Sequence, residues 1–515
     1  MKNFGELVSE KDFSIFDYFK FNPEEAPSPV KEVVFLKGSW REMGLQYGQQ
    51  AKDALHRKVA FFLQLDLAKA KEYSRLYEDL EKYVEHYQKY FPEFIELMQG
   101  MAEGAELGFY DIVATYTIYV PQPTHNCSHV SAWGEATGNG KIIGGANWDY
   151  EGNLRMYEPA VVAFPEDGHA FISSSGICTN SMINDAGLMV LSSGGQNNRP
   201  EDHKDIGFQY MVGFLYLSAK CKDAEEAKEA LLHDGISSCM ANNVHIVDAD
   251  CHAFMLEHTA AGDEIRHPGD FGEKDYLVAT NHFITEKMKP ALYTGDMAWV
   301  DCQYRYDTEE RILLDDFGHV NLDTINNSLG SNRYIDGDKW IEDVWSFAPV
   351  GCGTIGEFCP ENTDPLCKCV MRGLIDVKAR ALYIMAGCRN VYVSERPYAT
   401  GNFSRLMLKD SIKKVVSNAK TYAQSMIFTA SRDLSAMEKA DKDRALYLNR
   451  AKETLYAGLN YMNLADCAKE GIEKLSLYSK AVTKFCYAQC YGQLAQDDPL
   501  KVVREEMGSE WEELI

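Results

Sequence analysis

The chain has 515 residues, enough to bury one large hydrophobic core or two, and its apolar and charged fractions of 45% and 25% are those of a globular protein in water. Its 77 acidic residues outnumber its 52 basic ones, which gives a formal net charge of −25. A surface with this charge repels phosphate backbones and anionic lipid, so we expect no nucleic-acid partner.

The N-terminal residues contain no apolar segment of the secretory type, and no apolar run in the chain reaches the roughly 18 residues that a membrane-spanning helix needs. The 14 cysteines are dispersed through the sequence rather than concentrated as in small secreted domains. We therefore expect a cytoplasmic protein with reduced thiols, no secretory signal and no membrane span.

The first predicted elements are a short strand at 33–36 and a series of helices after it. Ser39 and, three residues later, Glu42 form the pattern of a capping box, in which the two side chains satisfy free backbone N–H groups at the start of a helix. Apolar residues then recur at three- and four-residue spacing up to about residue 119, as on one face of a helix. Residues 1–126 are therefore expected to be a helical N-terminal segment.

Strands are predicted to predominate over 127–398, because short apolar runs bounded by turn residues recur there. The clearest runs are 160–164, 171–174, 187–192, 244–248, 253–257, 276–281 and 381–386. Helical patterns at 207–233 and 305–317 separate some of them, which favours sheets covered by helices on their outer faces. Residues 399–515 read as a helical C-terminal segment that packs onto the core or forms the contact of a homo-oligomer.

The stretch around Cys127 organises the predicted core. Residues 126–133 and 141–150 are strand-like runs that flank Gly-Asn-Gly at 138–140, and this arrangement predicts a hairpin because glycine readily adopts positive φ. The returning strand carries Asp149 back to the neighbourhood of Cys127. A thiol on one strand and a carboxylate on its partner form a candidate site.

Asn126-Cys127-Ser128, followed about twenty residues later by Gly-Ala-Asn-Trp-Asp-Tyr at 145–150, resembles the autoproteolytic penicillin acyltransferase-like family of N-terminal-nucleophile (Ntn) hydrolases. That family is related more distantly to choloylglycine hydrolases and acid ceramidase. The resemblance covers roughly residues 33–390. It implies an α+β fold with a four-layer αββα sandwich, and self-cleavage at the Asn126–Cys127 bond. Residues 1–126 would then be a propeptide that remains bound as the small subunit.

The resemblance also implies the roles of four residues. Cys127 would be the nucleophile, and after cleavage its own α-amine, with an ordinary pKa of about 7.7–8.0, would take the thiol proton. Asp149 would orient that amine and the substrate amide. Asn281, in Thr-Asn-His-Phe at 280–283, would help to hold the oxyanion. Arg305 would be the functional arginine of the family.

Alternatives stay open at several of these positions. Asn281 also fits a turn residue that caps a following helix, and Arg311 competes with Arg305 for the arginine of the family. Cys302 stands where the family more often has serine before this arginine. The choloylglycine branch has an arginine three residues before the aspartate, where this chain has Ala146, and the difference argues against bile-salt specificity.

A second candidate site is a group of four cysteines close together in the sequence. They are Cys352, Cys359, Cys367 and Cys369. Structural zinc sites usually have paired Cys-x2–4-Cys spacings, which this group lacks, so reduced thiols in a strand pair are the preferred interpretation. The histidines without a ligand pattern are also read as structural; they are His245, His252, His258 and His282.

The function implied by the resemblance is that of a cysteine amidohydrolase or acyltransferase. It would act on the linear amide C–N bond of a small-molecule substrate through a thioester, with no metal and no organic cofactor. One alternative is an N-acyltransferase that uses an acyl-coenzyme A donor. Another is a catalytically silent binding or scaffold protein that retains the fold, and a third is a zinc-stabilised interaction module around the four cysteines.

Overall fold

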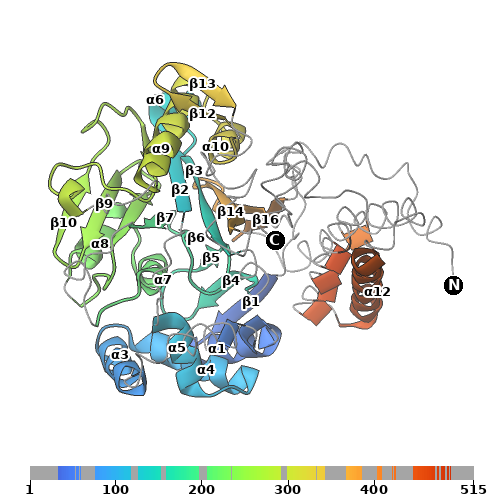
Figure 1. The fold of residues 1–515 in the computed structure, drawn as a ribbon. Helices are drawn as coiled ribbons and strands as arrows, with labels where there is room; N and C mark the ends of the chain where they lie inside the picture. Colours follow the sequence, from blue (N-terminus) through green and yellow to red (C-terminus); the bar gives the residue numbers. More distant parts are fainter. Residues whose placement is uncertain are drawn as a thin grey trace, which may run out of the picture.

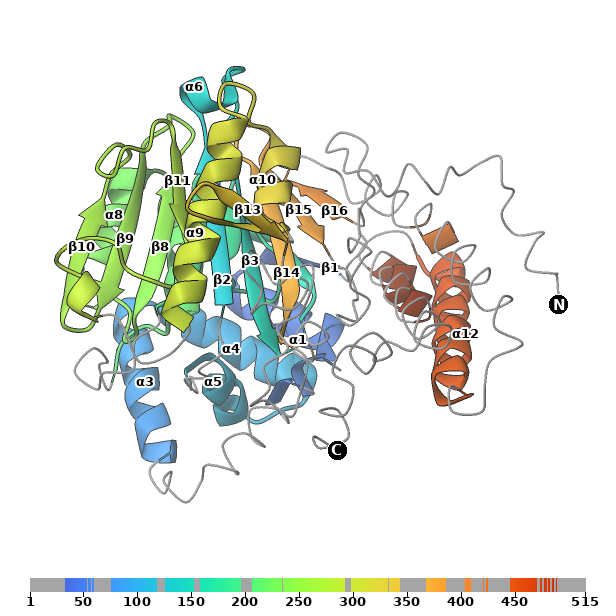
Figure 2. The ribbon, with the colours of Figure 1, turned by 45° about the horizontal axis from the view of Figure 1, so that its top comes forward.

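The computed structural model describes the chain from residue 33 to residue 488, with gaps. The described residues are 33–52, 54–56, 58–59, 76–117, 126–151, 158–195, 206–233, 235–291, 298–331, 333–342, 367–385, 403–408, 420, 423–424, 445–469, 473–474, 477–478, 480–481, 484–485 and 488. Two large β-sheets form the centre of this structure (Figure 1). Figure 2 shows the strands of both sheets in a turned view.

The larger sheet has eight strands. Their spatial order is β1 (Val33–Gly38), β4 (Ala160–Pro165), β5 (Phe171–Ser173), β6 (Ser181–Asn184), β7 (Met189–Gly194), β8 (Asn242–Val247), β9 (Ala253–Thr259) and β10 (Gly262–Arg266). All neighbours are antiparallel except β1 and β4, which are parallel. Residues 1–126, the N-terminal segment expected to be mainly helical, therefore contribute β1 as an edge strand of the larger sheet.

The smaller sheet has six strands. Their order is β11 (Tyr276–Ala279), β2 (Asn126–Ala132), β3 (Ile143–Glu151), β14 (Cys367–Asp376), β15 (Ala381–Met385) and β16 (Phe403–Met407). β16 is a correction to the sequence analysis, which predicted helices throughout the residues after 401. Its backbone extends β15 as an antiparallel edge strand, a pairing that local patterns do not reveal. A separate hairpin consists of β12 (Arg333–Asp336) and β13 (Lys339–Glu342).

Helices cover the outer face of each sheet, and the two sheets face each other through β2, β3 and β7. Outside the larger sheet lie α1 (Trp40–Gln50), α3 (Leu76–Tyr90), α4 (Pro92–Ala105), α5 (Phe109–Thr117), α7 (Tyr210–Lys220) and α8 (Ala224–Leu231). Outside the smaller sheet lie α9 (Ala298–Asp315) and α10 (Leu322–Leu329). The predicted αββα layering is confirmed.

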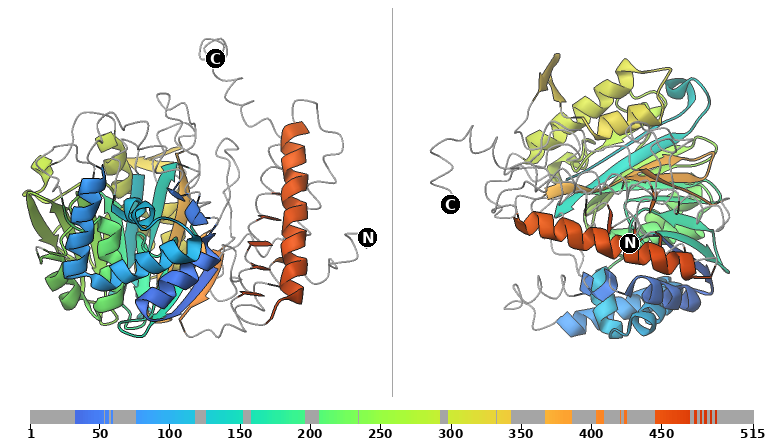
Figure 3. Two further views of the ribbon diagram at one scale, coloured as in Figure 1. Left: turned by 90° about the horizontal axis from the view of Figure 1, so that it is seen from below. Right: turned by 90° about the vertical axis from the view of Figure 1, so that its right-hand side faces the viewer.

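The remaining described elements are peripheral. The short α6 (Gly134–Thr137) lies between β2 and β3, and a 3-10 turn follows β11 at Lys289–Ala291. The C-terminal α12 (Ala445–Cys467) lies beside the sandwich (Figure 3). Among the helices that the structure describes, none combines the length and the apolar character needed to cross a bilayer.

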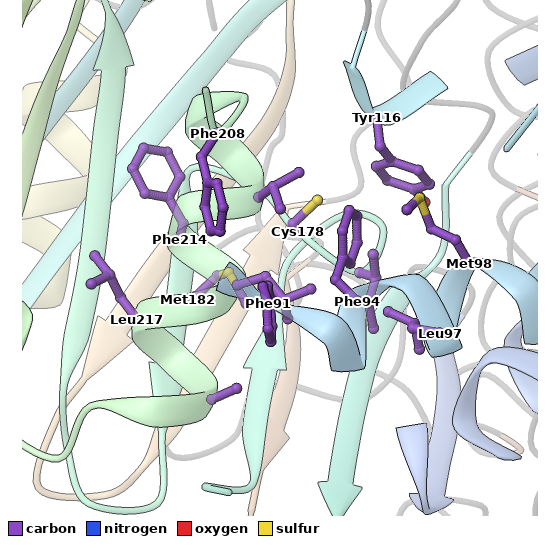
Figure 4. Close-up of a cluster of buried hydrophobic side chains, with 14 of the residues drawn as sticks. Phe91, Phe94, Leu97, Met98, Tyr116, Cys178, Met182, Phe208, Phe214 and Leu217 are labelled. Carbon is purple, nitrogen blue, oxygen red and sulfur yellow. The ribbon is translucent and has the colours of Figure 1, made fainter. Parts of the chain in front are cut away.

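The buried side chains form separate clusters between the layers. The cluster between the larger sheet and its helices is rich in aromatic rings and sulfur (Figure 4), and its members include Phe91, Phe94, Met98, Tyr116, Cys178, Met182, Phe208 and Phe214. A second cluster lies between the two sheets, and a third lies between the smaller sheet and helices α9 and α10. Val130 and Ala132 of β2 belong to the third cluster, so the alternate residues of β2 face the larger sheet.

Helices α1 and α4 pack unusually closely because glycines line their contact. A Cβ atom added to Gly44 would lie 2.1 Å from the carbonyl oxygen of Leu97, and one added to Gly100 would lie 2.3 Å from that of Arg41. Neither glycine can therefore be replaced without moving the helices apart. At the start of α1 the predicted capping box is present, since the Ser39 and Glu42 side chains each accept a hydrogen bond from the backbone N–H of the other.

The predicted hairpin of β2 and β3 is confirmed, with Cys127 paired to Trp148 in the antiparallel register. The connection is longer than a two-residue turn because α6 is inserted in it. Gly138 ends α6 with φ 63°, and Gly140 has φ 70°. A Cβ on Gly138 would lie 2.1 Å from the carbonyl oxygen of Gly318, so this position requires glycine for space as well as conformation.

Candidate active site

Cys127 is the second residue of β2 and is almost fully buried, with 5% of its surface exposed. Side chains two residues apart on a strand share a face, so Cys127 lies on the same face as His129 and Ser131. Those two side chains contact the larger sheet, which shows that this face of β2 is directed between the sheets. The thiol is therefore positioned at the start of a strand, on the inner side of the sandwich.

Asn281 lies two residues beyond β11, the strand that pairs with β2 on its other side. Its Oδ1 atom accepts a hydrogen bond of 2.8 Å from the backbone N–H of Cys127, and its Nδ2 atom donates one of 2.8 Å to the carbonyl of Gly194 at the end of β7. The side chain is fully buried. Through these two bonds the Asn281 side chain joins β2 to β7. It therefore does not act as a helix cap, which was the alternative interpretation.

Arg305 extends from α9 to the same point and is also fully buried. One guanidinium nitrogen donates to the carbonyl oxygen of Cys127 at 2.6 Å and to Ser128 Oγ at 3.1 Å. The other nitrogen donates to Asn281 Oδ1 at 3.0 Å and lies 3.3 Å from Cys302 Sγ. The guanidinium group thus bridges the carbonyl oxygen of Cys127 and Oδ1 of Asn281, and it places a positive charge beside both.

The competing candidate, Arg311, has a different environment. Its side chain is 44% exposed and pairs with Asp315 one turn further along α9, at 2.8 Å. An exposed pair of this kind contributes little to stability and has no connection to Cys127. Of the two arginines, the structure brings only Arg305 to the site.

Asp149 pairs with Asn126 in the register of β2 and β3. It directly follows Trp148, the residue that pairs with Cys127. The side chains of Asp149 and Asn126 lie outside the described residues. The roles assigned to them, orientation of the amine and the cleavage point, therefore remain predictions.

The backbone around Asn281 is held at several points. Asn243 of β8 donates from Nδ2 to the carbonyl of Thr280 at 2.9 Å and to that of His282 at 3.1 Å. Thr280 Oγ1 donates to the carbonyl of Cys302 at 3.0 Å. These bonds fix the residues on both sides of Asn281, so its amide group is presented to Cys127 from a constrained loop.

His282, next to Asn281, is neutral in this environment. Burial lowers its pKa to about 3, and the nearby Arg305 charge acts in the same direction. Its Nδ1 atom lies 2.8 Å from Thr280 Oγ1. The Thr280 hydroxyl donates its proton to the carbonyl oxygen of Cys302, so it must accept from Nδ1–H of His282. The imidazole ring therefore helps to hold the loop around Asn281.

Sequence reasoning missed a second buried arginine on the outer face of the smaller sheet. Arg372 of β14 donates from Nε to Asn147 Oδ1 at 2.8 Å, and Asn147 in turn donates to the carbonyl of Leu329 at 2.6 Å. Asn147 is paired with Ser128, so this group lies beside the contacts of Arg305. No local pattern identifies it, since only the register of β2, β3 and β14 brings these residues together.

The zinc hypothesis cannot be placed on this structure. Cys352 and Cys359, and the side chains of Cys367 and Cys369, lie outside the described residues. Within the part of the chain that is described, no three or more His, Cys, Asp or Glu side chains form a group that could hold a metal ion.

Residues 136–299 match the family model described as acyl-coenzyme A:6-aminopenicillanic acid acyl-transferase. The match spans just under a third of the chain and includes Asp149 and Asn281 but not Cys127 or Arg305. It confirms the resemblance to the penicillin acyltransferase-like family, and with the αββα sandwich it identifies the fold as that of Ntn hydrolases. By its description, the family that these residues resemble consists of acyl-transferring enzymes.

Solved structures similar to the chain include penicillin V acylase from Agrobacterium tumefaciens, with 13% identity and a TM-score of 0.32 over 50% of this chain and 82% of that one. A variant of the conjugated bile acid hydrolase from Clostridium perfringens has 13% identity and a TM-score of 0.34 over 55% of this chain and 93% of that one. A second variant of that hydrolase has 12% identity and a TM-score of 0.32 over 55% and 94%. No curated protein matches the sequence.

Proposed function

We propose that this protein is a cysteine amidohydrolase or acyltransferase that cuts itself at the Asn126–Cys127 bond and then acts on linear amides of small molecules. The observation that carries the proposal is the hydrogen bond from the Cys127 backbone nitrogen to Asn281 Oδ1. That nitrogen is the atom which becomes an α-amine if the bond is cut. It already has a buried, fixed acceptor, and Arg305 holds the carbonyl on the other side of the same residue.

In the proposed maturation, the Cys127 thiol attacks the carbonyl carbon of Asn126. The C–N bond breaks as a C–S bond forms, the thiol proton passes to the released nitrogen, and a thioester results. Water then hydrolyses the thioester, which leaves a carboxylate on Asn126 and a free α-amine and thiol on Cys127. One side chain thus serves both maturation and catalysis.

In the catalytic cycle, the neutral α-amine takes the thiol proton and the thiolate attacks the substrate carbonyl. The amine proton passes to the leaving nitrogen, and water or an acceptor amine resolves the thioester. Asn281 Oδ1 would orient the amine by accepting one of its hydrogens, and the Arg305 charge nearby disfavours the protonated amine, which could not act as a base. The second Nδ2 hydrogen of Asn281 is the one assigned to the oxyanion.

The N-terminal segment is proposed to stay bound after the cut. β1 pairs with β4 from Val33↔Ala160 to Gly38↔Pro165, and residues of α1 and α4 share a buried cluster with the larger sheet. A buried ion pair of 2.5 Å also joins Lys58 to Glu158, across the cleavage point. Separating residues 1–126 from the rest would expose these surfaces to water, which is strongly unfavourable.

The test is an assay of amide hydrolysis with a set of N-acylated chromogenic amines that vary in acyl length. Cys127→Ala should lower the rate by roughly 10³-fold or more, because no other group can form the thioester. Cys178→Ala is the matched control: this thiol is equally buried, and burial raises its pKa to about 12, but it lies in the cluster outside the larger sheet. Equal activity of the wild type and Cys127→Ala on every substrate would contradict the proposal.

A second candidate function is N-acyl transfer from an acyl-coenzyme A donor, which the description of the matching family favours. It uses the same nucleophile and thioester, but the first leaving group is a thiolate and the acceptor is an amine. Release of free coenzyme A that depends on an added amine would favour this reaction. Hydrolysis of amides without any such dependence would favour the first.

A further inference from the structure

A chain of buried polar side chains connects the two sheets beside the candidate site. His129 Nδ1 lies 3.1 Å from His245 Nδ1, and Ser131 Oγ lies 2.7 Å from His245 Nε2. On the other side, His129 Nε2 lies 3.1 Å from Ser193 Oγ, which donates to the carbonyl of Thr280. All four side chains are at most 1% exposed. Of these four side chains, only His245 was given an interpretation from the sequence, as a structural histidine.

The geometry determines the direction of every bond in this chain. A carbonyl oxygen can only accept, so the Ser193 hydroxyl gives its proton to Thr280 and must itself accept from His129 Nε2. His129 then carries its proton on Nε2 and accepts at Nδ1. His245 must therefore donate from Nδ1, and its Nε2 accepts the proton of Ser131.

In the neutral form, each imidazole has a hydrogen-bond partner at both of its ring nitrogens. The surroundings of the two rings also favour the neutral form. Burial lowers the pKa of His129 to about 3 and that of His245 well below its usual range, and the charge of Arg266 acts in the same direction. A second proton on His129 would have to sit on Nδ1, where it would set two N–H groups against each other at the contact with His245 Nδ1. The polar chain is thus a single, fully directed arrangement.

The polar chain runs from the strand of Cys127 to the loop of Asn281. His129 lies two residues after Cys127 on the same face of β2, and the final acceptor is the carbonyl directly before Asn281. Ser193 also directly precedes Gly194, whose carbonyl accepts from Asn281 Nδ2. Through these contacts the two histidines connect the strand of the nucleophile to the loop that holds its nitrogen.

We propose that His129 and His245 are positioning residues, which set the place of Asn281 relative to the Cys127 nitrogen through Ser193 and the Thr280 carbonyl. This inference rests on the proposed function, because it gives the histidines a role in presenting the α-amine. Their described hydrogen bonds run to each other, to Ser131 and to Ser193.

The test compares Ser193→Ala with Ser192→Ala. Both serines lie in β7, are at most 1% exposed and lose one hydroxyl, but Ser192 Oγ has no hydrogen-bond partner in the described structure. Ser193→Ala should lower kcat about tenfold with KM changed by less than about twofold, whereas Ser192→Ala should leave both within about twofold. Ser193→Ala should melt at a lower temperature than Ser192→Ala, because it leaves the buried Nε2–H of His129 without its acceptor, so both variants are assayed well below either melting temperature. Equal kcat values for the two variants would overturn the proposal.

A second readout does not depend on activity. ¹⁵N chemical shifts of labelled histidine at neutral pH should show His129 with its proton on Nε2 and His245 with its proton on Nδ1. The opposite assignment for either ring would overturn the directed chain. A wild type that is inactive on every substrate while the shifts agree would instead overturn the proposed function, and with it the positioning role.

Discussion

Replacing Arg305 by methionine should lower activity by at least about 100-fold and the free energy of unfolding by about 3 kcal/mol. Methionine has a similar length but no donors, so it leaves the Cys127 carbonyl and Ser128 Oγ without bonds that Arg305 supplies, and Asn281 Oδ1 with one donor fewer. Buried acceptors without partners are costly, and the loss of a nearby positive charge also favours a protonated, inactive α-amine. Urea unfolding and steady-state kinetics measure the two effects.

Arg305→Lys and Arg311→Met complete this experiment. Lysine keeps the charge but cannot bridge the Cys127 carbonyl and Asn281 Oδ1 with a planar fork, so Arg305→Lys should also be impaired. Arg311→Met removes an exposed arginine from the same helix and should change stability by no more than about 0.5 kcal/mol. A greater loss of activity from Arg311→Met than from Arg305→Met would contradict the assignment.

Acid should destabilise the protein steeply between about pH 6.5 and pH 3. His129 and His282 have folded pKa values of about 3, against about 6.5 in an unfolded chain. In this window the unfolded state binds protons that the folded state excludes, so the free energy of unfolding falls as the pH falls. Each such histidine contributes up to about 1.4 kcal/mol per pH unit, and His245 acts in the same direction.

Urea unfolding from pH 7 to pH 4 tests this expectation. The double variant His129→Gln, His245→Gln should be less stable than the wild type at pH 7 but should lose less stability toward pH 4. His252→Gln is the control, because the His252 side chain is 74% exposed. If the double variant and the wild type have the same slope with pH, the two histidines are not buried as neutral groups.

Much of the fold could be predicted from local sequence patterns. The apolar runs of β4, β7, β8 and β9 and the Gly-Asn-Gly connection predict strands and a hairpin because burial and turn chemistry are local properties. The place of β1 in the larger sheet and the existence of β16 could not be predicted. Both depend on which distant strand supplies hydrogen-bond partners to an edge, and residue patterns contain no such information.

In the candidate site, too, some residues could be predicted from sequence motifs and others could not. Cys127, Asn281 and Arg305 were selected because their surrounding motifs resemble a known family, and the structure brings them together. The polar chain through His129 and His245 has no motif. It exists because β2 faces β7 across the sandwich at a register that also brings His129 and Ser131 to His245 of β8, and the spacing of histidines along the sequence does not reveal that contact.

The intact mass of the denatured protein, compared between the wild type and Cys127→Ala, tests self-cleavage at the Asn126–Cys127 bond directly. We expect two wild-type polypeptides, one ending at Asn126 and one beginning at Cys127, and a single uncut chain for the variant. A wild type that remains one uncut chain would mean that the α-amine does not exist. The proposed base would then be absent, and the silent scaffold interpretation would replace the enzyme.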